Sequence, residues 1–379
     1  MASKKNKNEN PQKKGKKKSS DAKTSLILSL ILFLLTITGI IILFLAPDPA
    51  MQTPEEAGEG AEDEPTDSAG GFELPEIYRP PSYRFKEEEI IVTAPGISRE
   101  YTICWVSDVH MITDFEAGDV SAESLDTVKD RYETLSVTPE GIHGRELWPE
   151  IVDYLNYNDF DAVIFGGDIL DYCSTSNMEA LKKEYDRLKY PPDRILYIRA
   201  DHDVGTWYSD GSTGFDDKKA KELHAELDGN DETHKYIDFG DLIIAGVNMS
   251  IRSPGETQME VLRDLYSKGV PVIAATHVPY YSTVDDSLEE LSMLVRNRIY
   301  YWSPGGELYD PDVEMREYLD LIYDEKSPCI MVLAGHLHSS WDGEIKKGLR
   351  EHIFAPAFSG YVGVIHVVPL NDEVSNTNN

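Results

Sequence analysis

Cysteine is scarce in this 379-residue sequence, which contains only Cys104, Cys173 and Cys329. Three is an odd number, and the intervals between these residues match no metal-binding motif. Neither a disulfide framework nor a closed, cysteine-ligated zinc site is therefore expected. Because Cys104 and Cys329 lie in apolar, strand-like runs, we expect buried free thiols instead.

Basic residues are scarce except at the N-terminus, and the whole chain carries a net charge of −32. Nine lysines between Met1 and Lys23 face only Glu9 and Asp21, so this segment carries +7 and the remainder carries −39. An acidic exterior repels polyanions, and nucleic acid is therefore not expected as a partner. Ordinary solvation is the simplest alternative reason for the acidity.

Long apolar runs are absent except for residues 25–46, which contain no charged residue. At about 1.5 Å per residue this run would span about 33 Å as a helix, which matches the ~30 Å hydrocarbon core of a bilayer. We predict one transmembrane helix that acts as a signal-anchor. A cleaved signal peptide is the competing interpretation, although the run is longer than is usual and has no well-placed cleavage site.

The charges on either side of the apolar run predict its orientation. All nine early lysines precede it, so the positive-inside rule makes residues 1–24 a cytoplasmic tail and places the folded part outside the cell. A Lys-rich tail with one anchor and no sorting motif favours a bacterial plasma membrane. Residues 47–80 hold ten acidic residues and no basic residue up to Glu76, which predicts an acidic disordered linker.

Residues 81–370 have the pattern of one globular domain, and residues 371–379 form a polar tail. Residues 89–93 and 100–106 flank Pro95-Gly96 and are predicted to pair as a hairpin. Apolar strands and amphipathic helices then alternate, and a β-rich segment follows at 341–368. This alternation predicts an α/β layered sandwich. Strands are expected at 162–165, 195–198, 242–247, 270–275 and 329–334, and helices at 146–157, 178–188, 217–227, 258–267 and 313–323.

Two connections in this domain are unusually long, at residues 111–145 and 279–311. Long loops in compact domains are often lids or binding loops, but a surface insertion without a role is an equally good interpretation.

Asp and His residues follow the ends of five predicted strands, where α/β sheets usually place their sites. A single Asp at such a position is often a helix cap, and a single His is often structural. Five strand ends that all carry such residues are hard to assign to chance. These residues are Asp108 and His110, Asp168 and Asp171, Asp201 and His202, His277, and His336 and His338.

Carboxylate and imidazole groups without thiolates suit divalent ions such as Mn, Fe or Zn. A carboxylate such as that of Asp168 can bridge two ions that lie roughly 3.5–4 Å apart. Such a pair binds a hydroxide and holds a phosphoryl oxygen for in-line attack. The residues therefore predict a site for two divalent metal ions.

The order of the motifs, D-x-H, G-D-x-x-D, H-D, H and G-H-x-H, resembles the calcineurin-like metallophosphoesterase superfamily from about Tyr101 to His366. The resemblance implies a β-sandwich flanked by helices. It also implies the role of each residue: His202 contacts the phosphate and the leaving oxygen, and Asp171 orients His202. The implied ligands are Asp108, His110 and His338 for the first metal, Asp168 as the bridge, and Asp201, His277 and His336 for the second metal.

The third motif departs from the family pattern, because Ala200-Asp201-His202 stands where Gly-Asn-His is usual. Asp offers an oxygen at the same reach as Asn and adds a negative charge. We expect Asp201 to remain a ligand that binds a divalent ion more tightly and lowers the positive charge of the site. Thr276, where Gly is commoner, is expected to have little consequence.

These observations predict a dinuclear hydrolase that cleaves an extracytoplasmic phosphomonoester or phosphodiester by attack of a metal-bridging hydroxide. The substrate is expected to be a nucleotide, a phospholipid or a cell-wall phosphodiester. The alternative is a catalytically inactive cell-surface module that binds metal and phosphate, which Asp201 alone supports. A redox-active oxygenase is disfavoured because it needs an open two-His-one-carboxylate site.

Other side chains are open to two interpretations. Aromatic residues near the motifs either stack on substrate or pack in the core: Trp207, Tyr208, Tyr280, Tyr281, Tyr300, Tyr301 and Trp302. Among the remaining histidines, His224 and His234 are expected to be solvated and His352 and His366 to be structural. His143 lies in the first long loop, from which it could reach substrate.

Overall fold

The computed structural model describes residues 79–113, 115, 120–205, 208, 224, 225, 227, 235–248 and 254–370. These residues belong to one compact unit, Phe72–Asn379. The predicted cytoplasmic tail, transmembrane helix 25–46, most of the linker and the tail 371–379 lie outside the described residues. Within the described ranges, no helix combines the length and the hydropathy needed to cross a membrane.

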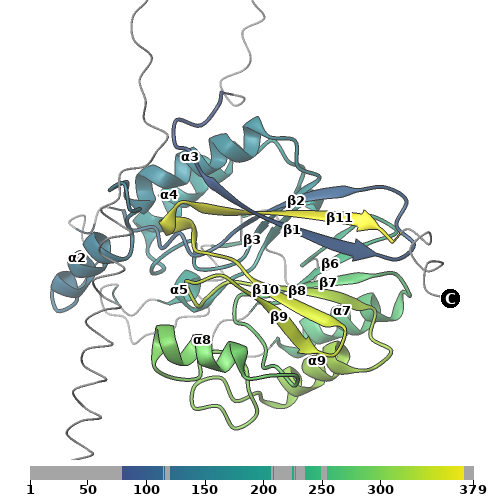
Figure 1. The fold of residues 1–379 in the computed structure, drawn as a ribbon. Coiled ribbons are helices and arrows are strands. Elements are labelled where there is room, and N and C mark those ends of the chain that lie inside the picture. Colours follow the sequence, from purple (N-terminus) through teal and green to yellow (C-terminus); the bar gives the residue numbers. More distant parts are fainter. Residues whose placement is uncertain are drawn as a thin grey trace, which may run out of the picture. The chain divides into compact units, whose positions relative to one another are not determined.

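Two β-sheets form the centre of this unit, and helices cover their outer faces (Figure 1). The first sheet has the order β1 (Lys86–Ala94), β11 (Tyr361–Pro369), β2 (Tyr101–Val106), β3 (Ala162–Phe165) and β4 (Ile195–Tyr197). The second has the order β5 (Tyr236–Asp238), β6 (Ile243–Gly246), β7 (Val272–Ala275), β8 (Cys329–Ala334), β10 (Leu349–Ile353) and β9 (Trp341–Lys346). Strands β2, β3 and β4 are parallel, as are β6, β7, β8 and β10.

Helices were predicted between the strands, and the structure places them on both sides of the sandwich (Figure 1). Helices α3 (Gly144–Tyr157) and α4 (Thr175–Tyr185) pack on the first sheet, and α7 (Glu256–Ser267) and α9 (Val313–Tyr323) pack on the second. The shorter elements are α2 (Leu125–Thr134), η2 (Pro192–Arg194), α5 (Asp201–Val204), α8 (Ser287–Arg296) and η3 (Ala357–Ser359). The predicted helix 217–227 lies mostly outside the described residues.

Three apolar layers hold these parts together. Side chains such as Ile103, Ile164 and Ile273 fill the space between the two sheets, where all three are fully buried. The outer faces of the sheets form the other two layers with their helices. Strands β3, β6 and β7 are buried along their whole length, as expected for parallel strands covered on both faces. The prediction of an α/β layered sandwich is confirmed.

The predicted hairpin between β1 and β2 is wrong. Strand β11 lies between them and pairs in parallel with β1, at Ile90 and Ile365, and antiparallel with β2, at Ile365 and Ile103. The turn signal itself was real, because Gly96 has a φ of 78°. A β-branched strand from the far end of the chain competes for the same edges, and local sequence does not reveal that competition.

The two long connections each contain a helix that was not predicted, α2 in the first and α8 in the second. Helix α2 buries only Val128 and Tyr132, and α8 buries only Leu288 and Ser292. Each pair is spaced by four residues and forms a single narrow stripe, which is too little to stand out from a polar loop in sequence.

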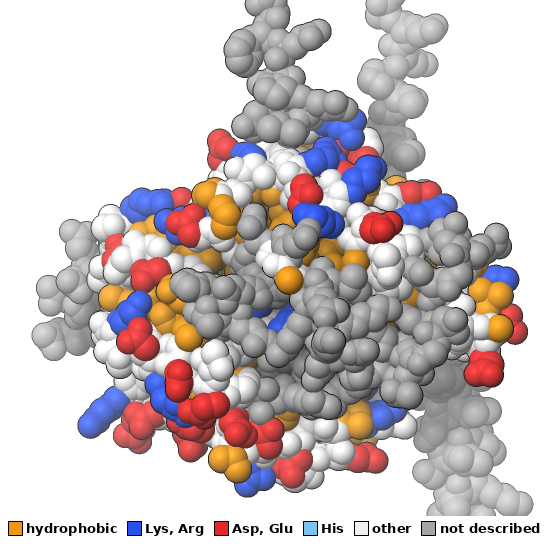
Figure 2. Space-filling view, turned by 180° about the vertical axis from the view of Figure 1, so that it is seen from behind, with side chains coloured by type: hydrophobic (Ala, Val, Ile, Leu, Met, Phe, Trp, Pro, Cys, Tyr) orange, Lys and Arg blue, Asp and Glu red, His pale blue; other side chains and the backbone are white. Residues whose placement is uncertain are grey.

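The three cysteines are free, in agreement with the expectation of free thiols. Cys104 and Cys173 are buried, whereas Cys329, which was expected to be buried, is only partly buried. Acidic side chains gather along the lower part of the face shown in Figure 2. Their abundance agrees with the net charge of −32 of the chain.

Glu351 on β10 is an acidic residue in the interior. Its side chain is fully buried, and it accepts hydrogen bonds from the backbone N–H of Tyr280 at 3.1 and 3.3 Å. Burial raises the pKa of Glu351 well above its ordinary value of 4.5, which the Tyr280 hydrogen bond only partly offsets. The folded state therefore retains a proton that the unfolded state releases as the pH rises past 4.5.

Folding stability should fall as the pH rises from the unfolded-state pKa through the raised folded-state pKa. Replacing Glu351 by Gln keeps an acceptor for Tyr280 and removes this fall. We expect Glu351→Gln to stabilise the protein by on the order of 1 kcal/mol near pH ~8 and by less near pH ~5, as measured by denaturant unfolding. Glu344→Gln, at an exposed position on β9, is the matched control. An equal effect of Glu351→Gln at both pH values would contradict the prediction.

Candidate metal centre

The structure brings together all nine residues that the sequence singled out. Potential ligand atoms form three groups, and within each group the atoms lie within 4.8 Å of one another. The first and second groups share Asp168, and the first and third share His110. The groups are Asp108, His110, Asp168 and His338; Asp168, Asp201, His277 and His336; and His110, Asp171 and His202.

Both sheets contribute to these groups. Asp108 and His110 follow β2, Asp168 follows β3, His277 follows β7 and His336 follows β8. Because parallel strands end at the same edge of a sheet, the loops after them converge. The site therefore lies where the carboxyl ends of the two sheets meet, and Asp201 and His202 reach it from the first turn of α5.

The backbone at this edge is strained at five positions that carry ligand side chains. Asp108, His110, Asp168, His336 and His338 all have φ between 49° and 73°. This left-handed region disfavours residues with a Cβ atom, typically at a cost of about 1–3 kcal/mol each. Within the described residues, only Asn297 is another non-glycine residue with positive φ. Strain that is concentrated in this way is typical of a functional site.

Backbone hydrogen bonds between the loops hold the strained conformation. The N–H of Asp108 donates to the carbonyl of Gly167 at 2.9 Å, and the N–H of His110 donates to the carbonyl of Asp168 at 3.0 Å. Gly167 has a φ of 95°, and a Cβ atom there would lie 2.7 Å from Nδ1 of His277. The loop after β3 therefore needs glycine at this position.

Asp203 is a residue of this site that sequence reasoning missed. Its carboxylate is fully buried and accepts from the backbone N–H groups of Asp168, Ile169 and Leu170 at 2.9–3.1 Å. It also accepts from the backbone N–H of Ala200 at 3.0 Å and from the hydroxyl of Tyr197 at 3.0 Å. One carboxylate thus fixes the loops after β3 and β4 together. The sequence signal was its place directly after His202, although that pattern alone does not distinguish a ligand from a support.

Hydrogen bonds to one ring nitrogen orient the histidines toward the centre. Nδ1 of His277 is 2.8 Å from the carbonyl of Gly166, so it carries the proton and donates, and Nε2 faces Asp168 at 3.1 Å. Nδ1 of His110 is 2.9 Å from a carboxylate oxygen of Asp171. Nε2 of His110 therefore faces the first group, where it lies 3.0 Å from Nε2 of His338. Partners of this kind are the usual support for metal-binding histidines.

The charges within the cluster are strongly coupled. Burial raises the pKa of Asp168, but the rings of His277 and His202 outweigh it and hold that pKa well below its ordinary value. Burial lowers the pKa of His277, but Asp168 and Asp108 outweigh it and raise the pKa to about 10. Burial lowers the pKa of His338 to about 4. The buried carboxylates are thus stabilised by positive charge on neighbouring histidines, but these histidines do not neutralise all of the negative charge.

Asp201 shows that the donor set fits metal ions. One of its carboxylate oxygens is buried and has no hydrogen-bond partner, and burial together with the nearby Asp168 raises its pKa. A buried, unpaired carboxylate oxygen is costly unless a cation approaches it. Oxygen and imidazole donors at these separations suit two divalent ions that share Asp168.

His202 has a different partner atom from the one expected. Its Nδ1 lies 2.7 Å from the backbone carbonyl of Asp171 and 3.6 Å from the carboxylate of the same residue. That carboxylate instead contacts His110 and receives the guanidinium of Arg131 on α2. Asp171 thus lies beside His202, but its main-chain oxygen makes the hydrogen bond. The carboxylate is occupied because Arg131 offers a second N–H donor in bidentate geometry.

A cavity of about 360 Å³ opens onto the cluster. The ring of His202 is 19% exposed and lines it, together with Asp168 and His336. Two arginines that sequence reasoning missed also line it, Arg131 from α2 and Arg296 from the end of α8. Both long connections therefore deliver a cation to this cavity.

The aromatic and histidine predictions have mixed outcomes. Tyr280, Tyr301 and Trp302 are buried in apolar clusters, so packing is their role, whereas Tyr300 lines the cavity and stacks on the His336 ring at 4.3 Å. The prediction that His224 is solvated is wrong. It is fully buried, and its Nε2 lies 2.9 Å from the carbonyl of Asp203. A polar helical context in sequence does not reveal which face a neighbouring loop covers.

Of the remaining histidines, those that the structure describes do not line this cavity. His143 begins α3 and stacks on Tyr132 with ring centres 3.8 Å apart. His352 lies between Glu88 and Asp342, and His366 contacts Glu100, which agrees with structural roles. His234 and Trp207 lie outside the described residues.

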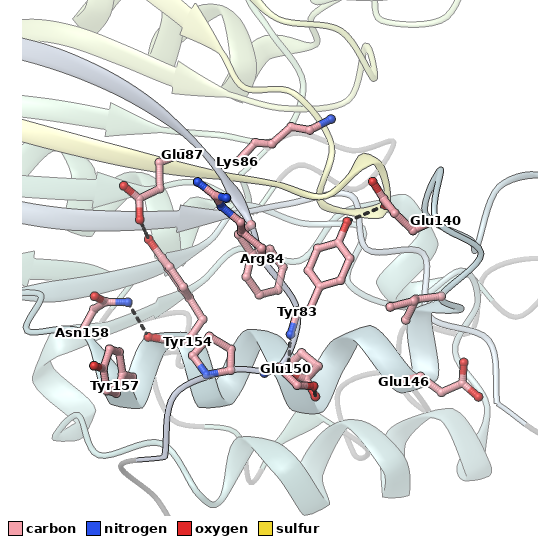
Figure 3. Close-up of a pocket in the computed structure, with 14 residues that line it drawn as sticks. Tyr83, Arg84, Lys86, Glu87, Glu140, Glu146, Glu150, Tyr154, Tyr157 and Asn158 are labelled. Carbon is pink, nitrogen blue, oxygen red and sulfur yellow. Dashed lines mark hydrogen bonds between the residues drawn. The ribbon is translucent and has the colours of Figure 1, made fainter. Parts of the chain in front are cut away.

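A larger cavity of about 1360 Å³ lies elsewhere, between residues 81–87 and α3 (Figure 3). None of the nine predicted site residues lines it. Hydrogen bonds among its own lining residues occupy many of its polar groups, such as those of Tyr83 with Glu140 and of Tyr154 with Glu87 (Figure 3). The smaller cavity at the strand ends is therefore the candidate active site.

Residues 101–340 match the model of the calcineurin-like phosphoesterase family, and the chain belongs to that family. It is a hydrolase of the metallophosphoesterase class, and its Asp and His groups are arranged to bind metal. No curated protein sequence matches the chain.

Solved structures that match the chain include phosphopantetheinyl hydrolase from Mycobacterium tuberculosis. It is 12% identical, has a TM-score of 0.36, and the match covers 71% of this chain and 96% of the other. A dimetal phosphatase from Danio rerio is 11% identical with a TM-score of 0.37, and the match covers 68% and 88%.

The network around Asp203 generates a prediction. In Asp203→Asn, one acceptor oxygen becomes an NH₂ group that faces backbone N–H donors. We expect a loss of about 1–3 kcal/mol in unfolding free energy and a loss of about 10–100-fold in Mn²⁺ affinity. Denaturant unfolding and isothermal titration measure the two effects. Asp193→Asn, at a side chain that is 70% exposed, is the control. Unchanged metal affinity in Asp203→Asn would show that the network does not position the ligands.

Proposed function

We propose that the protein hydrolyses an extracytoplasmic phosphomonoester or phosphodiester at a dinuclear centre built on Asp168. The observation that carries the proposal is the pair of four-residue donor groups that share this one carboxylate. A shared carboxylate is the arrangement that two ions a few ångströms apart require. The strained backbone at Asp168 supports it, because residues held in such conformations cluster at functional sites.

Each of these two groups would hold one ion, in the assignment that the resemblance to the family implies. Asp108, His110 and His338 would complete the first site with Asp168, and Asp201, His277 and His336 would complete the second. Two divalent ions, with Mn, Fe and Zn as the candidates, lower the pKa of a water molecule and offset the charge of a phosphoryl group. The extra charge of Asp201 favours tight binding of the second ion. It also makes the site less positive than the usual Asn would.

We infer that His202 acts on the leaving group. The Asp171 carbonyl fixes the proton on Nδ1, so Nε2 is the nitrogen available to the cavity. Burial lowers the pKa of His202, but the carboxylates of Asp168, Asp201 and Asp171 outweigh it and raise the pKa. When the ring carries a second proton, it can donate from Nε2 to a phosphoryl oxygen and then to the departing oxygen. Asp171 and Arg131 support this role by holding the loop that presents the carbonyl.

Two substitutions separate metal binding from proton transfer. Asp168→Asn should abolish turnover of an aryl phosphate ester and lower the metal content, because a neutral amide bridges two cations poorly. His202→Ala should lower kcat by about 10²–10⁴-fold and leave the metal content unchanged. Metal analysis of each purified variant beside the activity assay makes the comparison. Loss of metal in His202→Ala, or full activity in either variant, would contradict the proposed roles.

We further propose that residues 25–46 anchor the protein in a bacterial plasma membrane, with residues 1–24 in the cytoplasm and residues 81–370 outside. The uncharged apolar run and the lysines that precede it support this orientation.

Topology can be read from protease access. In intact spheroplasts, an added protease should degrade the domain, and in inverted vesicles it should leave the domain intact. A domain that is protected in spheroplasts and degraded in inverted vesicles would reverse the proposed orientation. Release of the domain as a soluble protein that lacks residues 1–46 would show that the apolar run is a cleaved signal peptide.

A further inference from the structure

The last turn of α8 exposes three consecutive apolar side chains. Leu294 is 83% exposed, and Met293 and Val295 are 44% and 38% exposed. Leu288 and Ser292 on the same helix are buried and attach it to the domain. The apolar turn is therefore a fixed projection of the surface, and we call residues 293–295 the α8 tip.

Cations adjoin the α8 tip on one side. Arg296 ends the helix, and the exposed Arg298 follows it, with Asn297 between them in a left-handed C-cap. The acidic residues of this segment lie at the opposite end of the helix, where Asp285, Asp286, Glu289 and Glu290 are exposed. Charge is thus separated along α8, and the basic end is also the apolar end.

The α8 tip is continuous with the candidate active site. An Nη atom of Arg296 donates to the carbonyl of His336 at 2.9 Å, and the Arg296 side chain lines the cavity. Its buried Nε has no hydrogen-bond partner. The guanidinium also lies over the ring of Tyr300, 5.4 Å from its centre. A single residue thus joins the apolar projection to the cavity that leads to the metal ligands.

Hydrogen bonds hold the turn after the helix in place. The hydroxyl of Ser292 donates to the carbonyl of Arg298 at 2.8 Å and accepts from the N–H of Tyr300 at 2.9 Å. The cations and the apolar side chains therefore keep a constant spacing. An element that enters an interface gains from this rigidity, because little conformational entropy is lost on binding.

We propose that the α8 tip enters the surface of an anionic phospholipid bilayer and that the adjoining cavity takes a lipid-borne phosphoester from it. This inference rests on the proposed function and names its substrate class. Apolar side chains flanked by arginines are the composition that binds an interface, because the apolar groups leave water and the cations meet lipid phosphates. A soluble protein matches the α8 tip less well than an anionic bilayer does, since the basic end of α8 is suited to an extended anionic surface.

The predicted anchor makes such contact accessible. Residues 47–80 number 34, and a neutral coil of that length has an end-to-end distance of about 30 Å, which repulsion among the ten acidic side chains increases. A domain tethered at that distance meets the bilayer surface repeatedly, so a weak interfacial element is sufficient.

The contact can be measured without catalysis. The full chain carrying Leu294→Cys with an environment-sensitive dye would be reconstituted in vesicles of phosphatidylcholine alone or mixed equally with phosphatidylglycerol. We expect a blue shift and quenching by lipid-attached spin labels, both stronger in the mixed vesicles. Ile91→Cys on β1, where the side chain is 65% exposed, is the matched control, and unsubstituted protein corrects for labelling of the native cysteines.

Equal spectra at positions 294 and 91 would overturn the proposal. A blue shift at position 294 that depends on protein concentration and needs no vesicles would also overturn it, because a second copy would then cover the α8 tip. Arg298→Gln should remove the difference between the two lipid compositions. A difference that persists in Arg298→Gln would show that this cation does not contribute.

The substrate class is tested with nitrophenyl phosphates, mono- and diester, each with and without a long alkyl chain on the ring. Leu294→Ser should lower turnover of the vesicle-borne ester about tenfold and leave the soluble ester unchanged, whereas Ile91→Ser should change neither. Equal turnover of the vesicle-borne ester by Leu294→Ser and by the unsubstituted protein would overturn the inference but leave the proposed function intact. If the metal-loaded protein cleaves no ester, the proposed function fails, and the dye measurement still decides whether the α8 tip enters lipid.

Discussion

The main constraint on the site is that the fold holds several carboxylates close together although they repel one another. Asp108, Asp168 and Asp201 lie in an interior where two like charges 4 Å apart cost about 4 kcal/mol even at an effective dielectric constant near 20. Histidines relieve part of this cost, and the unpaired oxygen of Asp201 shows that relief is incomplete. The rest of the strand-end architecture serves to hold this arrangement against its own repulsion.

The carboxylates are held in place by the main chain and its hydrogen bonds to Asp203, rather than by contacts among the ligand side chains. Left-handed backbone at Asp168 turns its carboxylate inward, and the buried Asp203 collects the N–H groups that this turn exposes. The strain, the support and the ligands thus form one unit across the loops after β3 and β4. Metal binding by this unit would convert a costly cluster of charges into a stabilised one.

Much of the fold and of the candidate site was predictable, because strand ends are local features. The segments 162–165 and 329–334 were predicted as strands with the bounds that the structure shows, and the nine site residues follow such ends. Non-local events defeated prediction. Strand β11 separates β1 from β2, and α2 and α8 bury too few apolar side chains to stand out within long connections.

The sequence by itself determined which residues would come together, since Asp and His at the carboxyl ends of parallel strands are brought to the same end of the two sheets. The tertiary structure alone decided what surrounds them. In the structure, the carboxylate of Asp171 contacts Arg131 and His110, and the backbone carbonyl of Asp171 contacts His202. The structure also places Arg296 at the cavity. These partners lie far from one another along the chain, and their contacts depend on how two sheets and two loop helices pack, which no local pattern encodes.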